Sequence, residues 1–375
     1  MRRGSEGTTA RVCVISGSVG AGHDGAADEL VRRLHDLGVA TDRRDYLDAL
    51  PRVCQYVLRD GYRNSLVLIP QLFGWVFDSL EYHSFVQRVT FWMCRIARRH
   101  VQRWVRDHDV VVSTYMLASQ TLGLLKEAGE LDADLVTFLT DPAVHRMWVH
   151  PAIDHHVTVT EATARMGRMV YRTPMTAVGG LVSTHFTHRS DATRRDKMRA
   201  ELGLSPDGTV ALVVAGSLGT GDVPHTVRTI SSSGVAQVVV LCGRNKHLHK
   251  KLSGEDGVIA LGWRDDIPDL MAAADVLVHN AGGLSVTEAL TVGLPTVTFR
   301  PIPGHGVANA EVLADAGLAP WPKDESELIA VVRDHAAIRT DPAAVTRSRD
   351  TASMVLELLA ERGQHTVADR DSRPA

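Results

Sequence analysis

Cysteine is scarce and scattered in this sequence. Its four copies, Cys13, Cys54, Cys94 and Cys242, form no Cys-x-x-Cys pair. Zinc knots and disulfide frameworks both need thiols at close, regular spacings, so the sequence excludes both kinds of stabilised domain. The same scarcity fits a reducing, cytoplasmic compartment.

An excess of positive charge is also missing. The chain carries 41 Lys and Arg against 44 Asp and Glu, a formal net charge of −3. No chain-wide basic field therefore exists that would concentrate a phosphate polymer at the surface. The sequence predicts no nucleic-acid partner.

Long hydrophobic runs are absent as well. The longest, Leu66 to Phe77, is interrupted by Pro70, Gln71 and Gly74 and is too short to span a bilayer. Near the start of the chain, the run Val12 to Ile15 has the length of a strand rather than of a signal peptide. We therefore expect a cytoplasmic protein, with a peripheral place on the cytoplasmic face of the membrane as an option.

What the chain does contain is enough apolar material for two domains. Its 375 residues, 44% of them hydrophobic, allow two separate cores. Short β-rich runs alternate with helical patterns, which is typical of doubly wound α/β domains with parallel sheets. We expect a disordered N-terminus at 1–10, an acceptor-binding domain at 11–182, a linker at 183–206, a donor-binding domain at 207–362 whose last helix packs back on the first domain, and a disordered tail at 363–375.

Glycine-rich turns follow the first strand of each half, at 16–22 and at 215–221. Ligands of open α/β sheets bind at the carboxyl ends of the strands, where both turns fall. Two facing domains would therefore close a cleft lined by both turns. The runs expected as strands are 12–15, 110–113, 135–139, 155–159, 210–214, 235–242, 258–261, 276–279 and 296–299.

The first turn ends in Gly20-Ala21-Gly22-His23, which puts a histidine at the start of a helix expected over 24–37. A helix N-terminus disfavours the imidazolium ion, so His23 would be neutral and able to take a proton from a hydroxyl at pH 7. The alternative is that His23 only caps the helix. No later acidic residue of a dinucleotide fold accompanies the turn, so it does not indicate NAD.

The most informative stretch runs from His279 to Leu290 and predicts a strand, a Gly282-Gly283 turn and a helix opening at Ser285. Unpaired N–H groups and the helix dipole make such an opening an anion site. Glu288, one turn into the helix, can accept hydrogen bonds from the two vicinal hydroxyls of a ribose. The stretch therefore favours a nucleoside diphosphate ligand, against the alternative of an ordinary helix start with glycines for tight packing.

Taken together, the motifs of the chain resemble those of the monogalactosyldiacylglycerol synthase and processive diacylglycerol glucosyltransferase family, which is related to the muramyl-pathway N-acetylglucosaminyltransferase. The resemblance extends from Val12 to about Glu361. It implies a glycosyltransferase B fold, an inverting reaction, a UDP-sugar donor in the C-terminal domain and an acceptor in the N-terminal domain. The motifs are Gly20 to His23 with Ala26-Ala27, Thr140 to His145 with Trp148, Cys242 to Asn245, Gly262-Trp263 through Asp275, and Gly282-Gly283 to Glu288 with Pro303-Gly304 and Asn309.

The resemblance also implies roles for single residues. His23 would be the base or would position the acceptor, and Glu288 would hold the ribose. The backbone near Trp263 and Arg264 would read the uracil. The UDP-sugar is the co-substrate, and no metal or other cofactor is implied. The other expected substrate-binding residues are Gly20, Gly22, Asp141, His145, Gly216, Ser217, Gly243, Arg244, Gly282, Gly283, Ser285, Thr287, His305 and Asn309, with Asp141 the next candidate for the base.

Three departures from the family pattern matter. The chain has Pro303 to Gly306 as Pro-Gly-His-Gly where the family has Pro-Gly-Gln-Glu, which leaves the donor sugar open. The crossing between domains reads Gly180 to Ser183 and lacks the family's proline, which predicts a looser hinge. The glycine-rich run Gly219 to Gly221 predicts an altered diphosphate loop.

The segment from Asn64 to Arg106 joins an apolar, aromatic patch to a series of arginines. On helices this pattern suits an anionic membrane surface and a lipid acceptor. The alternative is a core helix with a solvated basic face. A metal site is a further interpretation, for the four histidines between 145 and 156, but their spacing fits no zinc pattern and we predict none.

The leading hypothesis is an inverting hexosyltransferase that moves a sugar from a UDP-sugar to a diacylglycerol-type lipid in glycolipid biosynthesis. One alternative is a UDP-sugar-dependent transferase that acts on a soluble or natural-product acceptor. Another is a nucleotide-sugar-binding protein without transferase activity.

Overall fold

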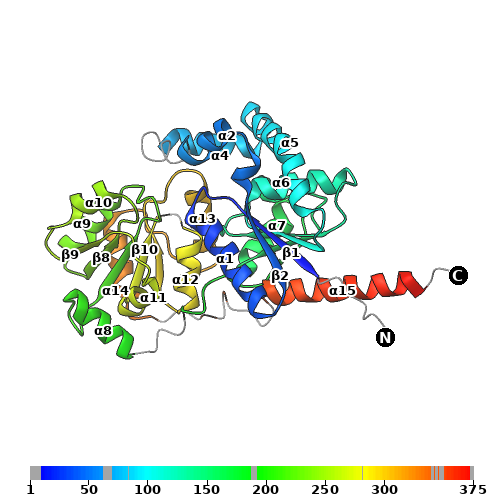
Figure 1. The fold of residues 1–375 in the computed structure, drawn as a ribbon. Helices are drawn as coiled ribbons and strands as arrows, with labels where there is room; N and C mark the ends of the chain where they lie inside the picture. Colours follow the sequence, from blue (N-terminus) through cyan, green and yellow to red (C-terminus); the bar gives the residue numbers. More distant parts are fainter. Residues whose placement is uncertain are drawn as a thin grey trace.

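The computed structural model describes residues 10–61, 70–82, 84–186, 192–280, 282–338, 342, 345 and 350–371. Two halves lie side by side, each built on a parallel sheet (Figure 1). The two doubly wound α/β domains predicted from the sequence are confirmed.

The first sheet has the strand order β2-β1-β3-β4-β5-β6, and every pair is parallel. Four strands follow the predicted apolar runs, whereas β2 and β6 were missed. β2 reads Ala-Thr-Asp-Arg-Arg-Asp and lies at the sheet edge, where a strand needs no continuous apolar run. The strands are β1 (Arg11–Ser16), β2 (Ala40–Asp45), β3 (Val110–Ser113), β4 (Asp134–Leu139), β5 (His155–Thr158) and β6 (Met175–Ala177).

The second sheet has the order β11-β10-β7-β8-β9, again all parallel. All five strands lie within predicted runs. Because β7 pairs with both β10 and β8, the turns that follow these three strands meet at one edge of the sheet. The strands are β7 (Val210–Val214), β8 (Gln237–Leu241), β9 (Val258–Leu261), β10 (Val276–His279) and β11 (Thr296–Thr298).

Helices connect the strands of both sheets (Figure 1). The first half contains α1 (Ala21–Asp36), η1 (Tyr46–Ala49), α2 (Arg52–Tyr56), η2 (Val57–Gly61), α4 (Pro70–Glu81), α5 (Phe85–Val105), α6 (Met116–Glu127), η3 (Arg146–Trp148) and α7 (Glu161–Val170). The helices that follow are α8 (Ala192–Leu202), α9 (Val223–Ser233), α10 (Lys246–Leu252), α11 (Ile267–Ala273), α12 (Leu284–Thr291), α13 (His305–Asp315), α14 (Glu325–His335) and α15 (Thr351–Asp371).

Helix α8 lies inside the stretch predicted as a linker and packs on α11 of the second half. Arg199 of α8 takes part in this contact, and its charged side chain is fully buried there. Its Nε donates to the Ala273 carbonyl at 2.9 Å, and its guanidinium pairs with Asp275 at 2.7 Å. A buried arginine needs such a set of acceptors, because an unpaired charge in the core is very costly.

Helix α15 contacts α1 and β3 of the first half. Val355 and Leu358 are buried in the same cluster as Val12 and Val110, and Arg362 donates to the Asp132 carbonyl at 2.9 Å. We expected a disordered tail from residue 363, whereas α15 continues to Asp371. Of the N-terminal stretch expected to be disordered, residues 1–9 lie outside the described part of the chain.

Two passes of the chain meet where the halves join. The Gly180 N–H donates to the Val345 carbonyl at 3.1 Å, so the outgoing and returning segments are bonded to each other. Arg33 of α1 adds two more bonds, to the Val182 carbonyl at 2.7 Å and to Asp350 at 2.9 Å. The crossing that lacks the family's proline is therefore fixed by hydrogen bonds and an ion pair.

Candidate functional site

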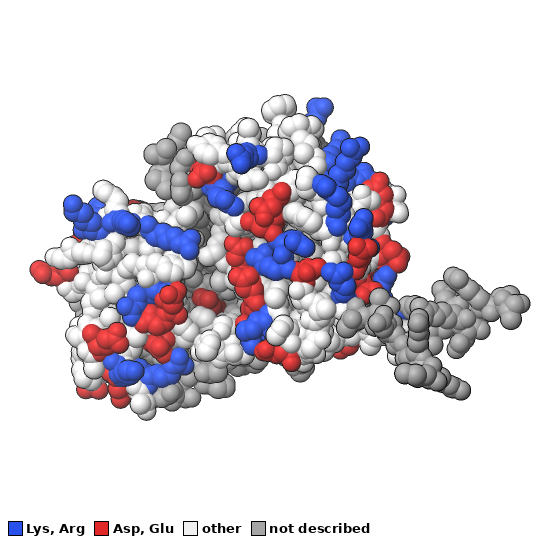
Figure 2. Space-filling view, viewed as in Figure 1, with Lys and Arg blue, Asp and Glu red and all other residues white. Residues whose placement is uncertain are grey.

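A cavity of about 1170 Å³ lies between the two halves. Both glycine turns line it, as the position of the turns at the carboxyl ends of the strands predicts. Figure 2 shows the groove, with acidic side chains along the side of the first half and basic side chains at the lip of the second. The predicted site residues that line it are Gly20, Gly216, Ser217, Gly243, Arg244, Trp263, Arg264, Ser285 and Glu288.

Two glycines in the second half shape the wall of this cavity. Gly216 and Gly243 have φ angles of +68° and +58°, which side chains rarely tolerate. A Cβ at Gly243 would also lie 2.6 Å from the carbonyl oxygens of Gly216 and Ser217. The Arg244 N–H donates to the Ser217 carbonyl at 3.0 Å and joins the turns after β7 and β8.

Helix α12 directs Glu288 toward the same cavity. Among the described residues, no donor bonds to its carboxylate. Burial raises the pKa of the Glu288 carboxyl to about 8. A carboxyl group held this way without a partner is a site for a ligand that offers hydrogen-bond donors. Ser285 of the same helix also faces the cavity.

A cation–π pair borders the cavity next to this helix. The guanidinium carbon of Arg244 lies 4.2 Å from the centre of the Trp263 ring, and 47% of Trp263 is exposed. The Arg264 side chain instead binds Asp266, with Nε and Oδ1 2.7 Å apart. This pairing raises the pKa of Arg264 and lowers that of Asp266. Arg264 therefore offers its backbone to a ligand more readily than its guanidinium.

His23 lies in the first turn of α1, with its ring fixed by two oxygens. Its Nδ1 is 2.8 Å from the Thr114 carbonyl oxygen and 3.0 Å from the Thr140 hydroxyl. A carbonyl oxygen can only accept, so Nδ1 carries the hydrogen and Nε2 has the free lone pair. The rings of Tyr115 and Trp148 flank the imidazole, with centres 5.3 and 5.9 Å away. This tautomer is the one that a general base requires.

His305 lies close enough to Asp141 and His23 for both of these residues to affect its pKa. Burial lowers the pKa of His305, the Asp141 charge opposes that shift, and His23 adds to it. The rings of His305 and Phe77 are 5.9 Å apart. The structure thus brings together three predicted site residues from different elements, although none of the three lines the large cavity.

Other predicted site residues have structural bonds instead. His145 is buried, accepts from the Met147 N–H at 3.1 Å and lies 3.2 Å from the Phe77 carbonyl oxygen. Burial lowers its pKa. The buried Asn309 accepts from the Ala143 N–H at 2.9 Å and thereby joins α13 to the loop after β4. These two side chains hold the loop that carries Asp141.

Four more of the predicted residues lie at the start of α12 or face it: Gly22, Gly282, Gly283 and Thr287. The Thr287 hydroxyl donates to the Gly283 carbonyl at 2.9 Å within its own helix. Its methyl group lies 2.4 Å from where a Cβ of Gly180 would be. Gly22 faces Leu284, and Gly282 faces Ser285 of its own half. None of these four residues lines the large cavity.

Sequence reasoning missed the acidic side of the cavity. Asp24, Asp28 and Asp60 line it from the first half, together with Arg59. Asp24 accepts from the Ser16 hydroxyl at 2.5 Å and pairs with Arg43 at 2.8 Å. The spacing of four between Asp24 and Asp28, directly after the glycine turn, was the available signal, since such residues share one helix face.

The histidines considered as a metal site have local roles. His150 accepts from the Ala152 N–H at 3.2 Å, and the His150 N–H donates to His156 at 3.5 Å. Burial lowers the pKa of both imidazoles, that of His156 to about 4. Within the described ranges, no group of three His, Cys, Asp or Glu side chains is arranged to hold a metal ion.

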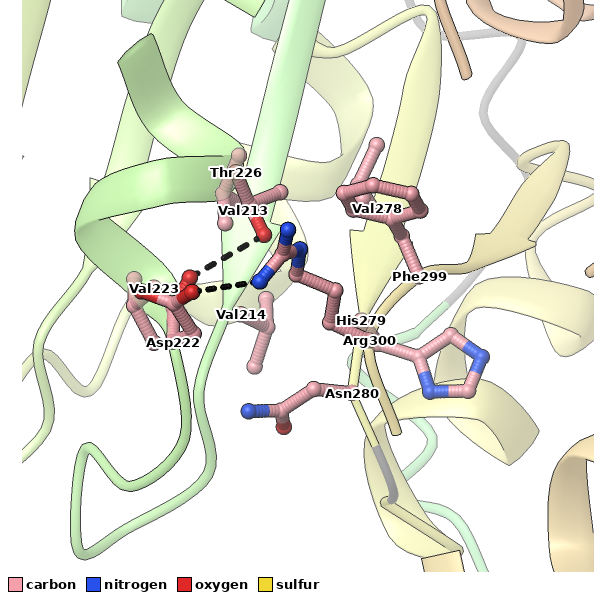
Figure 3. A pocket seen from close by; sticks show the side chains of 10 residues that line it. All are labelled: Val213, Val214, Asp222, Val223, Thr226, Val278, His279, Asn280, Phe299 and Arg300. Atoms are coloured by element: carbon pink, nitrogen blue, oxygen red, sulfur yellow. Dashed lines mark hydrogen bonds and ion pairs between the residues drawn. The ribbon is translucent and has the colours of Figure 1, made fainter. Parts of the chain in front are cut away.

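A second, very small cavity of about 10 Å³ lies beside the second sheet, with room for about one water molecule (Figure 3). Arg300 reaches across it to Asp222 at 2.7 Å. The Asn280 amide donates to the Thr220 carbonyl at 2.6 Å. The first bond holds Asp222, which follows the Gly219 to Gly221 run, and the second holds Thr220 inside it. This is the run that departs from the family pattern.

The segment predicted to contact a membrane is only partly described, since residues 62–69 and 83 lie outside the described part. Helix α5 buries Cys94, Ala97 and Val101 in the core and exposes an opposite face with Arg95 and Arg99. Exposed apolar side chains gather on α4, α5 and their neighbours α2 and η2. They are Val53, Tyr56, Val57, Leu72, Trp75, Tyr82, Phe85, Val89 and Trp92. Of the helices in the described part, none has the length and apolar character to cross a bilayer.

Solved structures with the same architecture define the fold class. Acinetobacter baumannii MurG matches with a TM-score of 0.53 at 15% identity, over 94% of this chain and 99% of its own. Arabidopsis thaliana UGT89C1 in complex with UDP-L-rhamnose matches with a TM-score of 0.59 at 12% identity, over 95% and 99%. The two facing parallel α/β halves are the glycosyltransferase B fold, which confirms the predicted fold class.

Sequence comparisons then show which families the two halves are similar to. Residues 23–170 match the family described as monogalactosyldiacylglycerol (MGDG) synthase, and residues 222–336 match glycosyl transferases group 1. The two matches confirm the resemblance found in the motifs: the chain is a glycosyltransferase whose first half is similar to the MGDG synthase family. A processive diacylglycerol β-glucosyltransferase of Bacillus licheniformis is 24% identical over 83% of both chains. One of Bacillus cereus is 22% identical over 85% of this chain and 84% of its own.

Proposed function

We propose that this enzyme transfers a hexosyl unit from a UDP-sugar to a diacylglycerol-type lipid, with inversion at the anomeric carbon. The observation that carries the proposal is the carboxyl of Glu288, which faces the cavity without a donor among the described residues. A ribose offers two neighbouring hydroxyls to such a group. The turn at Gly216 and the start of α12 are on the same wall, where backbone N–H groups suit a diphosphate.

The chemistry follows from the two sides of the site. Nε2 of His23 takes the proton of the acceptor hydroxyl while the hydroxyl oxygen forms a bond to the anomeric carbon. The bond from that carbon to the UDP oxygen breaks on the opposite face, and its electron pair leaves with UDP. Backbone N–H groups at the start of α12 stabilise the developing negative charge, so the reaction needs no metal ion.

The lipid acceptor is supported by the relatives and by the surface of the first half. Two relatives across more than four fifths of the chain are processive diacylglycerol β-glucosyltransferases. Trp75 is exposed on α4 and Trp92 on α5, and α5 also exposes Arg95 and Arg99. Aromatic and basic side chains together favour the surface of an anionic bilayer, so we place the enzyme peripherally on the cytoplasmic face.

UDP release tests the proposal directly. Purified protein is given UDP-glucose or UDP-galactose, with and without vesicles that contain diacylglycerol and anionic phospholipid. The proposal expects UDP release that requires the diacylglycerol vesicles and a glycolipid product of β configuration. UDP release with soluble hydroxyl acceptors alone would show that the acceptor is a soluble molecule and not a lipid. Tight UDP binding without turnover on any acceptor would identify a binding protein and refute the transferase.

A further inference from the structure

Thr140 is one of the residues through which the two sides of the site touch. It follows β4 directly and is buried. A Cβ at Gly283, the residue before α12, would lie only 2.3 Å from the Thr140 carbonyl oxygen. Real Cβ atoms do not approach an oxygen so closely, so any side chain at 283 would push the two segments apart. Gly283 therefore allows the donor-binding helix to start directly against Thr140.

The other end of Thr140 reaches the base. Its hydroxyl oxygen lies 3.0 Å from Nδ1 of His23, and the Thr114 carbonyl oxygen lies 2.8 Å from the same nitrogen. Thr114 also donates its hydroxyl to the His23 carbonyl at 3.0 Å. Thr114 thus fixes the tautomer and the backbone of His23. A second acceptor on the same N–H restricts how far the ring can turn.

The helices that carry the donor site and the base also meet directly. A Cβ at Gly25 of α1 would lie 2.9 Å from the Leu284 side chain of α12, and one at Gly22 would lie 3.7 Å away. Because Gly22 and Gly25 have no side chains, Leu284, the first residue of α12, can pack directly against α1. The contact through Thr140 and this packing set the distance between base and donor from two sides.

We propose that Thr140 is a positioning residue that couples the donor-binding helix to the base. Its carbonyl oxygen packs against the start of α12 at Gly283, and its hydroxyl orients the His23 ring. The inference rests on the proposed function, because it assigns His23 and α12 to one reaction. Thr140 itself touches no reacting atom, so its loss should affect the rate of the chemical step more than the binding of the donor.

The test compares Thr140→Val, Thr140→Ser and the matched control Thr176→Val, which changes an exposed threonine of β6. Thr140→Val should lower kcat about 10-fold and leave the Kd for UDP within about twofold, because the carbonyl remains. Thr140→Ser keeps the hydroxyl and should stay within about threefold of the wild type. Equal losses in the valine and serine variants would overturn the inference.

A backbone test addresses the other contact. Gly283→Ala should lower kcat about 10²-fold and weaken UDP binding about 10-fold, because α12 must move away from Thr140. The control Gly363→Ala places its Cβ in open space on α15. Adding Thr140→Val to Gly283→Ala should cost little more in kcat, since the coupling is already broken. Full additivity of the two losses would overturn the coupling.

A readout without turnover keeps this inference separate from the proposed function. In ¹⁵N-histidine NMR of the full chain, the Nδ1–H signal of His23, assigned by its loss in His23→Gln, should be visible in the wild type and in Thr140→Ser. In Thr140→Val the signal should change its chemical shift, because the bond to the Thr114 carbonyl remains while the second acceptor is lost. An unchanged signal in Thr140→Val would overturn the inference. A wild type that turns over no acceptor would refute the proposed function, while the NMR result would still decide the role of Thr140.

Discussion

The glycine turns on the two sides of the cleft use glycine for different physical reasons. In the second half, Gly216 and Gly243 have positive φ angles, so glycine is needed to direct the backbone. In the first half, Gly20 is extended, with φ of −150°, while Gly22 and Gly25 admit Leu284 of the opposite half. Similar strand–turn–helix patterns thus build a ligand-facing backbone on one side and a close helix contact on the other.

The largest effect should come from His23, the proposed base on the first side. We expect His23→Ala to lower kcat by about 10²-fold or more with little change in the donor KM, because His23 touches threonines rather than the donor wall. Steady-state kinetics with diacylglycerol vesicles measure it, with the exposed His247→Ala on α10 as the control. An intact kcat would move the role of the base to Asp141, to be tested with Asp141→Asn.

The matching change on the donor side is Glu288→Gln. It should weaken UDP binding about 10-fold or more, because an amide replaces one carboxylate acceptor of the ribose by a donor. Calorimetric titration with UDP measures this, and Glu311→Gln on the exposed face of α13 serves as the control. Unchanged UDP affinity would remove Glu288 from the donor site.

The same variant should be more stable than the wild type without ligand. The pKa of Glu288 is about 8 in the folded protein, against an ordinary value of 4.5, so folding disfavours its charge. The destabilisation that the Glu288 carboxyl causes is therefore absent below about pH 4.5 and grows as the pH rises toward 8. We expect a gain of about 1–2 kcal/mol for Glu288→Gln at pH 8 and none at pH 4.5, by urea unfolding. A gain that does not depend on pH would contradict the raised pKa.

The surface formed by α4 and α5 should bind membranes, and other exposed apolar sites should not. Replacing both Trp75 and Trp92 by serine should reduce sedimentation with anionic vesicles about 10-fold, because both indole rings are exposed. Activity on detergent-dispersed acceptor should be retained. The control replaces the exposed Leu37 and Ile338 by serine. Equal losses in the two double variants would refute a specific membrane surface.

The smallest effect tests the glycine comparison itself. Gly216→Ala should lower the free energy of unfolding by about 1 kcal/mol, because alanine is strained at φ of +68°. Gly20→Ala should change it by less than about 0.5 kcal/mol, since its extended backbone suits alanine and no atom lies within 4 Å of the new Cβ. Chemical denaturation measures both, and equal losses would mean that both turns need glycine for the same reason.

Sequence patterns predicted the parts of the molecule that rest on apolar runs. The central strands of both sheets are of this kind, whereas the edge strand β2 has charged residues and gives no such signal. Glu288 was predicted from its place one turn into a helix, which is a local property. Thr287 and His145 were also expected at the ligand, and in the structure Thr287 packs against Gly180 and His145 lies against Phe77, which are contacts between segments far apart in the chain. Such long-range contacts leave no periodicity or residue spacing in the sequence from which they could be predicted.

The paired crossing near Gly180 has a consequence for how the enzyme can move. Two chain passes joined by the Gly180 to Val345 bond, with Arg33 pinned to both, form a double connection along one line. The halves can bend about that line more easily than they can rotate past each other. We therefore expect opening for substrate exchange to change the width of the cleft while α12 meets the same residues of the first half each time the cleft closes.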